Sequence, residues 1–361
     1  MIAGGGTGGH LFPALALAEE FTRRDRTTEI TFIGGRGGLE EKVVPGYGYE
    51  LEVLRVEAIK KRRGLGLVKA LYRAVGATVS SLGLLRKIRP DGVIGSGSYA
   101  SGPVVLAAKL MGIKTAILEQ NAVPGLTNKL LGRFVDRVYI AFEDVAAYFP
   151  AARVVMAGNP VRRDIIEARA GEVRKSNGKL NIFVFGGSQG ATPINAAFLD
   201  ATEYLTDIWS SLRVVHQTGY EGLGAAKAAY SRKGLKVELH SFIENMAETY
   251  ASSDLVVCRA GATSIAEITA LGLPAILVPY PFATDGHQEV NARCLADSGA
   301  AVMIRQDELT GSTLARVIRG FFEDRRELKR MREEVKGLGR PGAAATIADD
   351  YVKVLAGEER G

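Results

Sequence analysis

A strand, a glycine-rich turn and a helix follow one another near the start of each half of this chain, and this repeat constrains the fold most. In the first half, a strand at 1–3 enters a glycine-rich run at 4–9. In the second half, an apolar strand at 180–185 enters a similar run at 186–190, and Pro193 stands early in the next helix, where proline is favoured. Because parallel α/β domains carry such a turn after their first strand, the repeat predicts two similar Rossmann-like domains.

The length and the middle of the chain agree with two domains. A chain of 361 residues is longer than one hydrophobic core usually serves. The run GNPVR at 158–162 precedes a charged segment at 167–179, so we expect the domain boundary near 158–163. The predicted domains are therefore 1–160 and 161–341.

The composition narrows the class of protein. A hydrophobic fraction of 47% with 43 glycines suits an α/β protein and excludes a disordered or fibrous chain. The two cysteines, Cys258 and Cys294, have no paired spacing, which supports neither a disulfide framework nor a zinc site. No run of about 18 apolar residues occurs and no signal peptide is recognisable, so we expect a chain that neither spans a membrane nor is exported.

The segment 259–292 has the pattern of a nucleotide-binding unit. An apolar run at 254–258 predicts a buried strand, and a short turn then leads into a helix that starts with Ala262, Thr263 and Ser264. Small residues there leave backbone N–H groups open to a diphosphate. The helix should stop at Gly272. Glu267 lies one turn along the same face, where a carboxylate can accept from ribose hydroxyls; the alternative is a merely solvated side chain.

The first glycine-rich run does not by itself identify its ligand. Gly4, Gly6 and Gly9 satisfy G-x-G-x-x-G, but the second strand ends in Gly34, Gly35 and Arg36 and lacks the acid that binds an NAD ribose. Arg36 keeps NADP as an alternative. The bare backbone otherwise suits a diphosphate or a sugar.

Two residues of the first half are candidates for general base. His10 stands in the first turn of a helix predicted at 11–22, where its imidazole suits general base catalysis; the alternative is a local backbone partner. Glu119 begins the polar triplet Glu119, Gln120 and Asn121 after a strand at 115–118, and ligands of doubly wound sheets bind at such strand ends. The alternative for Glu119 is an acceptor for loop N–H groups.

A basic segment predicts the partner surface. Residues 60–89 contain nine Lys or Arg and no acid, and the rest of the chain has a net charge of −3. Apolar residues at 68–88 recur with helical spacing beside Lys60, Lys61, Arg62 and Arg63, which predicts a helix on an anionic membrane surface. Nucleic acid is the competing partner, but without aromatic interleaving we expect no nucleic-acid binding.

The segment 259–292 closely resembles the donor-binding signature of the MurG family, glycosyltransferases of family 28 that add N-acetylglucosamine to the lipid-linked muramyl-pentapeptide of peptidoglycan. Five more family motifs occur in the expected order: GGGTGGH, GSGSYASGP, EQNAVPGLTN, GNPVR and GGSQGA. Leu118 departs from the pattern, since many members have histidine there. The resemblance implies an α/β GT-B fold, two Rossmann-like domains facing each other across a cleft, with the final helix, 342–361, packed on the first.

The reaction that the resemblance implies is an inverting transfer from UDP-N-acetylglucosamine to the C4 hydroxyl of the muramyl sugar in undecaprenyl-pyrophosphoryl-N-acetylmuramyl-pentapeptide. The first domain would face this acceptor and the cytoplasmic face of the plasma membrane, and the second would bind the UDP sugar. No Asp-x-Asp triplet occurs, and we expect no metal or other cofactor. His10 is assigned as the base, with Glu119 as its rival.

Three sets of residues are assigned to substrates. The substrate contacts are Thr7, Gly8, Gly9, Asn121, Arg162, Ser188, Ile243, Ala262, Thr263, Ser264, Ile265, Ala266, Glu267 and Gln288. The amide of Asn291 could also reach a sugar hydroxyl. The acceptor loop carries Ser98, Tyr99 and Ser101. Open alternatives are another GT-B enzyme, such as a glycolipid synthase or a UDP-N-acetylglucosamine epimerase, an NADP-binding oxidoreductase and a non-enzymatic nucleotide sensor.

Overall fold

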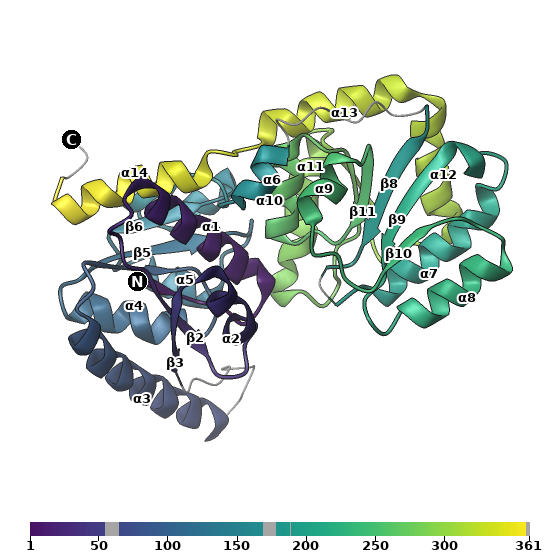
Figure 1. Cartoon of the computed structure of the whole chain (residues 1–361). Helices are drawn as coiled ribbons and strands as arrows, with labels where there is room; N and C mark the ends of the chain where they lie inside the picture. Colours follow the sequence, from purple (N-terminus) through teal and green to yellow (C-terminus); the bar gives the residue numbers. More distant parts are fainter. Residues whose placement is uncertain (55–64, 169–177, 188, 359–361) are drawn as a thin grey trace. The chain divides into compact units, whose positions relative to one another are not determined.

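The chain divides into two compact units, each built on a parallel sheet. The structure is a computed structural model that describes residues 1–54, 65–168, 178–187 and 189–358 (Figure 1). The first unit comprises Met1–Arg162 and Arg340–Gly361, and the second comprises Arg163–Gly339. All the strand pairs are parallel, as two Rossmann-like units require.

The first sheet has seven strands in the order β3-β2-β1-β4-β5-β6-β7. These strands are β1 (Ile2–Ala3), β2 (Thr31–Gly35), β3 (Glu50–Leu54), β4 (Gly92–Gly95), β5 (Lys114–Glu119), β6 (Arg137–Ile140) and β7 (Val154–Met156). The helices of this unit are α1 (Gly8–Arg24), α2 (Glu40–Val43), α3 (Leu65–Ile88), α4 (Ser101–Leu110), α5 (Leu126–Leu131) and α14 (Ala343–Ala356), with 3-10 turns at Val44–Tyr47, Glu143–Tyr148 and Ala151–Arg153.

Helices cover both faces of the first sheet because successive strand residues point to opposite sides. Ala3, Ile33 and Val93 pack with Leu85 of α3 and Val104 of α4. The neighbouring strand residues face the other side: Ile2 and Phe32 pack with Leu11 and Leu15 of α1, and Ile94 packs with Ile347 and Tyr351 of α14. The last helix is thus part of the first unit.

The second sheet has six strands in the order β10-β9-β8-β11-β12-β13. They are β8 (Leu180–Phe185), β9 (Leu212–Gln217), β10 (Glu238–His240), β11 (Leu255–Cys258), β12 (Ala275–Leu277) and β13 (Ala301–Met303). The helices are α6 (Arg163–Ala168), α7 (Thr192–Ala201), α8 (Leu223–Arg232), α9 (Met246–Ala251), α10 (Ala262–Leu271), α11 (His287–Asp297), α12 (Gly311–Glu323) and α13 (Arg325–Leu338), with 3-10 turns at Thr202–Tyr204, Trp209–Ser211 and Thr284–Gly286.

The strand order places a switch point in each sheet. The chain leaves β1 towards β2 and β3 on one side and returns to β4 on the other; β8 stands in the same relation to β9, β10 and β11. In doubly wound sheets, ligands bind outside the carboxyl ends of the strands at this point. The predicted glycine-rich runs follow β1, β4 and β8, and the predicted short turn at 259–261 follows β11. These four strands border the two switch points.

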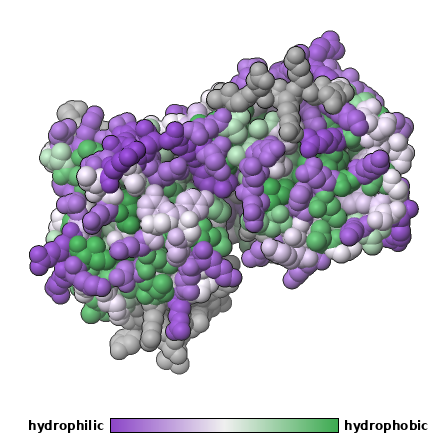
Figure 2. Space-filling model, viewed as in Figure 1, coloured by the Kyte–Doolittle hydropathy of each residue, from purple (hydrophilic) through white to green (hydrophobic). Residues whose placement is uncertain are grey.

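The first unit exposes apolar side chains on α3 and α4, namely Val75, Val79, Leu106 and Leu110. Figure 2 shows apolar residues among polar ones on this part of the unit. Within the described ranges, no helix is both long and apolar enough to cross a bilayer.

Candidate active site

Two turns and a strand end meet at the switch point of the first unit. The Ser96 N–H, after β4, donates to the Ala3 carbonyl of β1 at 2.8 Å. Gln120 follows β5, and its Nε2 donates to the Ser96 carbonyl at 2.7 Å. A side chain at Gly97, whose φ is +98°, would overlap the imidazole of His10. The second turn therefore lies directly against His10, the third residue of α1.

The acceptor loop has an unusual backbone at one of its predicted contacts. Ser98 has a φ of +74°, a left-handed conformation that non-glycine residues rarely adopt and that clusters at functional sites. Its carbonyl accepts from the buried hydroxyl of Ser101 at 2.9 Å. Tyr99 is exposed. Ser101 thus holds the loop, and Tyr99 is accessible to a ligand.

Glu119 is buried and serves its own loop. Its two carboxylate oxygens accept from the backbone N–H groups of Asn121 and Gly125, both at 3.1 Å, and from the Asn128 amide at 2.8 Å. Burial raises the pKa of Glu119, and these hydrogen bonds oppose the shift. This arrangement is the alternative that the sequence left open, an acceptor for loop N–H groups.

Glu40 is a buried acid that the sequence did not single out. Its carboxylate accepts from the N–H groups of Gly6 at 2.6 Å and Gly35 at 2.9 Å. Glu40 is 1% exposed. A carboxylate from α2 is therefore directed at the glycine-rich turn after β1.

Arg162 lies at the end of the first unit, with its guanidinium carbon 5.0 Å from the centre of the Phe12 ring of α1. This cation–π contact stabilises the side chain near the start of α1. Of the neighbouring predicted contacts, Thr7 and Gly9 are exposed and Gly8 is half-buried.

In the second unit, the turns after β8 and β9 pack backbone against backbone. A side chain at Gly190, whose φ is +77°, would overlap the Thr218 carbonyl. Gln217 Nε2 donates to the Gly187 carbonyl at 3.0 Å. Thr218 N–H donates to the carbonyl of His240 at the end of β10, and the predicted substrate contact Ile243 lies buried in the loop that follows. Ser188 lies outside the described residues.

The turn after β11 enters α10 as predicted. Gly261 caps the helix without a side-chain hydrogen bond, and Gly272 ends it in the left-handed conformation. Ala262 and Ile265 are buried, whereas Thr263, Ser264 and Ala266 are half-buried. Glu267 is only 5% exposed and accepts from the Tyr250 hydroxyl at 3.1 Å. The alternative of a merely solvated Glu267 is wrong.

Arg259 fixes the loop after β12, a role that the sequence analysis missed. Its guanidinium donates to the carbonyls of Val278 and Pro279 at 3.2 and 3.1 Å and to the Gln306 side chain at 2.7 Å. Burial lowers the pKa of Arg259. Such a group acts on the site through the loop that it holds.

The two predicted amides of α11 differ in position. Gln288 Oε1 accepts from the Tyr280 N–H at 2.9 Å, and Gln288 is half-buried. Asn291 is fully buried, and its amide donates to the Ala260 carbonyl at 3.3 Å. This side chain supports the turn before α10, and its contact with a sugar hydroxyl stays a prediction.

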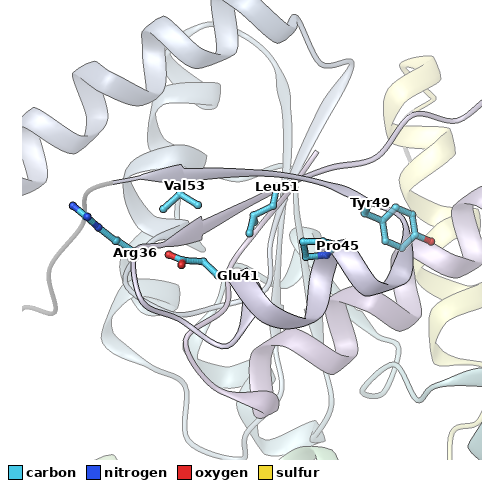
Figure 3. Close-up of a pocket in the computed structure, with 6 residues that line it drawn as sticks. All are labelled: Arg36, Glu41, Pro45, Tyr49, Leu51 and Val53. Carbon is cyan, nitrogen blue, oxygen red and sulfur yellow. The ribbon is translucent and has the colours of Figure 1, made fainter.

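No group of three or more His, Cys, Asp or Glu suited to a metal ion occurs among the described residues. A surface pocket lies at the β2–β3 edge of the first unit, lined by Arg36, Glu41, Pro45, Tyr49, Leu51 and Val53 (Figure 3). Apart from Arg36, the residue that kept NADP open, this lining contains no predicted site residue.

The two units match the two domains of one class of enzyme. Residues 1–140 match the glycosyltransferase family 28 N-terminal domain, and residues 181–347 match the family 28 C-terminal domain. The chain is therefore a family 28 glycosyltransferase with a GT-B fold.

The relatives define the family more closely. The UDP-N-acetylglucosamine–N-acetylmuramyl-(pentapeptide) pyrophosphoryl-undecaprenol N-acetylglucosamine transferase of Syntrophus aciditrophicus is 47% identical over 98% of both chains. The Myxococcus xanthus protein of that name is 48% identical over 98% of this chain and 92% of its own. The crystal structure of Acinetobacter baumannii MurG, 31% identical, superimposes with a TM-score of 0.79 over 98% of both chains. This chain belongs to the MurG family.

A UDP-GlcNAc 2-epimerase from Neisseria meningitidis has a TM-score of 0.68 over 98% of both chains but only 12% identity. That likeness concerns the fold alone.

Proposed function

We propose that this chain transfers N-acetylglucosamine from UDP-N-acetylglucosamine to the C4 hydroxyl of the muramyl sugar in undecaprenyl-pyrophosphoryl-N-acetylmuramyl-pentapeptide, with inversion at the anomeric carbon. The observation that carries this proposal is the 47% identity to a transferase named for these substrates, which extends over 98% of both chains. A similarity confined to the second domain would support binding of the UDP sugar but not the identity of the acceptor.

His10 acts as the general base in this proposal. The C4 hydroxyl attacks the anomeric carbon, the bond from that carbon to the UDP oxygen breaks, and the hydroxyl proton passes to the imidazole. The position of His10 beside Gly97, among strand ends that carry polar residues, supports this role. Glu119 is the weaker candidate, because both of its oxygens already accept hydrogen bonds from its own loop.

The second unit binds the donor. N–H groups at the start of α10, around Ala262 to Ser264, and in the turn that contains Ser188 stabilise the negative charge on the departing UDP, together with Arg162. The absence of a side-chain cap at Gly261 supports this use of α10. Ile243 contacts the uracil through its backbone, Glu267 accepts from the ribose, and the amides of Gln288 and Asn121 contact sugar hydroxyls.

The first unit binds the lipid-linked acceptor at the cytoplasmic face of the plasma membrane. Ser98, Tyr99 and Ser101 form the acceptor loop. Lys60, Lys61, Arg62 and Arg63 attract anionic lipid, and the helix at 68–88 rests on the bilayer surface. Lys60–Arg63 lie outside the described residues; the exposed Val75 and Val79 of α3 support the helix's part of this proposal.

A transfer assay tests the reaction. Radiolabelled UDP-N-acetylglucosamine and a lipid-linked muramyl-pentapeptide should give a labelled lipid disaccharide, whereas release of free sugar without acceptor would indicate a different GT-B enzyme. UDP-N-acetylglucosamine should raise the melting temperature and NADP should not; a shift with NADP alone would overturn the proposal.

The same assay tests the base. We expect His10→Ala to lower kcat by roughly 10²- to 10⁴-fold, the usual contribution of a general base. The dissociation constant for UDP should stay within error, because His10 does not contact the nucleotide in this mechanism. An unchanged kcat would remove His10 as the base.

A further inference from the structure

We infer that Glu40 fills, from inside the protein, the anion position of the first glycine-rich turn, so that this turn positions His10 and receives a sugar and not a pyrophosphate. The inference rests on the proposed function and decides between the two ligands, diphosphate and sugar, that the sequence left open for this turn.

The contacts of Glu40 resemble those of a bound anion. The two carboxylate oxygens each accept one backbone N–H, Oε2 from Gly6 and Oε1 from Gly35. Hydrogen bonds from N–H groups to an ionised acceptor are short and strong, and the 2.6 Å bond to Gly6 is at the short end. With 1% of its surface exposed, Glu40 has no access to bulk water.

The Gly6 N–H group that donates to Glu40 is at the position of the motif where a pyrophosphate binds in dinucleotide sites. Gly6 is the second glycine of G-x-G-x-x-G, the one that lets the backbone approach a pyrophosphate in dinucleotide sites. With this N–H already engaged, a pyrophosphate would lose a donor and would also approach a fixed negative charge, which is repulsive where water is excluded.

The surrounding backbone is shaped to hold this carboxylate. A Cβ atom built on Gly5, Gly34 or Gly38 would in each case overlap the Glu40 side chain. These glycines come from the turn after β1 and from the end of β2 with its following loop. Two segments therefore enclose one carboxylate, which fixes the turn that leads directly into α1 and His10.

In the second unit, a neutral amide and not a carboxylate contacts the glycine-rich turn after the first strand. Gln217 ends β9, the strand that corresponds to β2, and its neutral amide donates to the carbonyl of Gly187. This bond occupies no N–H of the turn. The only buried acid of the second unit, among the residues that the structure describes, is Glu267 on α10. Binding of the donor's diphosphate thus stays with the second unit.

The test compares Glu40→Ala and Glu40→Gln with the matched control Glu41→Gln. Glu41 is the next residue of α2, but it is exposed and accepts from the exposed Gly37 N–H at 2.7 Å. We expect Glu40→Ala to lower kcat by roughly ten- to a hundredfold, the effect of a misplaced catalytic group. The KM for UDP-N-acetylglucosamine should change less than twofold, because the donor contacts proposed for α10 and for the turn after β8 are unaltered. The control should match the wild type.

Chemical rescue shows whether Glu40 acts through its negative charge or only by filling space. Sodium formate should restore part of the kcat of Glu40→Ala and leave the wild type unchanged, whereas formamide should not. Glu40→Gln keeps the side-chain volume but turns an NH₂ group towards one of the two N–H donors, so its kcat should lie between those of the wild type and Glu40→Ala. If Glu40→Ala does not fold, Glu40→Gln replaces it in the kcat comparison.

Three results would overturn the inference: wild-type kcat in folded Glu40 variants, a parallel loss of donor affinity, or equal rescue by formate and formamide. A wild-type enzyme that transfers no sugar would instead overturn the proposed function.

Discussion

At the scale of single residues, the buried carboxylate of Glu267 carries the most specific prediction about the donor. An ionised carboxylate has about four acceptor sites on its two oxygens, and the Tyr250 hydroxyl donates to Oε2 of Glu267. We expect Glu267→Gln, which preserves volume, to weaken UDP binding by about 1–3 kcal/mol, the contribution of a charged hydrogen bond. Isothermal titration with UDP measures this loss.

The partner of that carboxylate supplies the control. Tyr250→Phe removes the internal hydrogen bond and leaves the charge of Glu267 in place, so UDP affinity should fall less than in Glu267→Gln. Titration with 2′-deoxy-UDP adds a second check, because the wild type should discriminate between the two nucleotides more than Glu267→Gln does. Equal discrimination by both proteins would show that Glu267 does not contact the ribose.

His216 makes the second unit sensitive to acid. It is fully buried, its Nδ1 lies 2.7 Å from the Tyr230 hydroxyl and its Nε2 lies 3.1 Å from Asn195 Oδ1. Burial lowers the pKa of His216 from 6.5 to about 4. Below pH 6.5 the unfolded chain therefore binds a proton that the folded chain excludes until about pH 4.

This difference in proton binding makes the folded protein less stable in acid. The contribution of His216 to stability is complete above pH 6.5 and is lost as the pH falls towards 4, by about 3 kcal/mol in total at 1.36 kcal/mol per pKa unit. Urea unfolding at pH 7.5, 5.5 and 4.5 should show a steeper decline for the wild type than for His216→Leu, which cannot titrate. Parallel declines would contradict the role of His216.

At the scale of elements, α14 is attached to the first sheet by a buried ion pair. Asp350 accepts from Arg137 Nε of β6 and from the Tyr139 hydroxyl, both at 3.0 Å. The side chains of Arg137 and Asp350 are 12% and 9% exposed. Removing one partner would leave the other charge buried and unpaired, so we expect Asp350→Ala to cost about 3–5 kcal/mol in the free energy of unfolding.

The adjacent residue is the matched control. Asp349 pairs with Arg24 of α1 at the surface, and its side chain is 64% exposed. Asp349→Ala should cost no more than about 1 kcal/mol, as surface ion pairs do. The double variant Arg137→Met/Asp350→Leu should be more stable than Asp350→Ala in urea unfolding, since it leaves no buried charge. Equal losses for Asp349→Ala and Asp350→Ala would refute the argument.

Elements set by local chemistry could be predicted from the sequence, and those set by distant contacts could not. The strand at 180–185 and the helix stop at Gly272 follow from an apolar run and a glycine position, and the structure confirms both. Glu40 and Asn291 serve turns 34 and 31 residues away, at Gly6 and Ala260. Only the pairing of strands brings these groups together, so no local pattern identifies them.

The same distinction applies to the candidate site. Glycine-rich turns and polar strand ends located it, because backbone conformation and strand direction follow from the residues themselves. The surroundings of each side chain could not be predicted from the sequence in this way. The same residue type, a carboxylate, is enclosed by three glycines at Glu40 and by loop N–H groups at Glu119.

At the scale of the whole molecule, the basic segment should decide where the enzyme works. An acceptor with an undecaprenyl tail stays in the bilayer, so an enzyme that reaches the bilayer surface meets more of it. Each Lys or Arg near an anionic surface contributes about 1 kcal/mol to binding. Reversing Lys60, Lys61, Arg62 and Arg63 to Glu should therefore release the protein from anionic vesicles in a sedimentation assay.

Two comparisons test whether vesicle binding depends on the basic segment itself and not on the net charge of the protein. The same charge reversal on α13 of the second unit, at Arg325, Arg326, Lys329 and Arg330, changes the net charge equally and should leave vesicle binding largely intact. With a short-chain soluble acceptor, both variants should retain wild-type kcat, because the reacting groups are unaltered. Since attraction between exposed charges is screened over about 8 Å at physiological salt, wild-type binding should also weaken as salt rises. Binding that survives the reversal of 60–63 would assign the membrane contact to apolar side chains alone, such as Val75 and Val79 of α3.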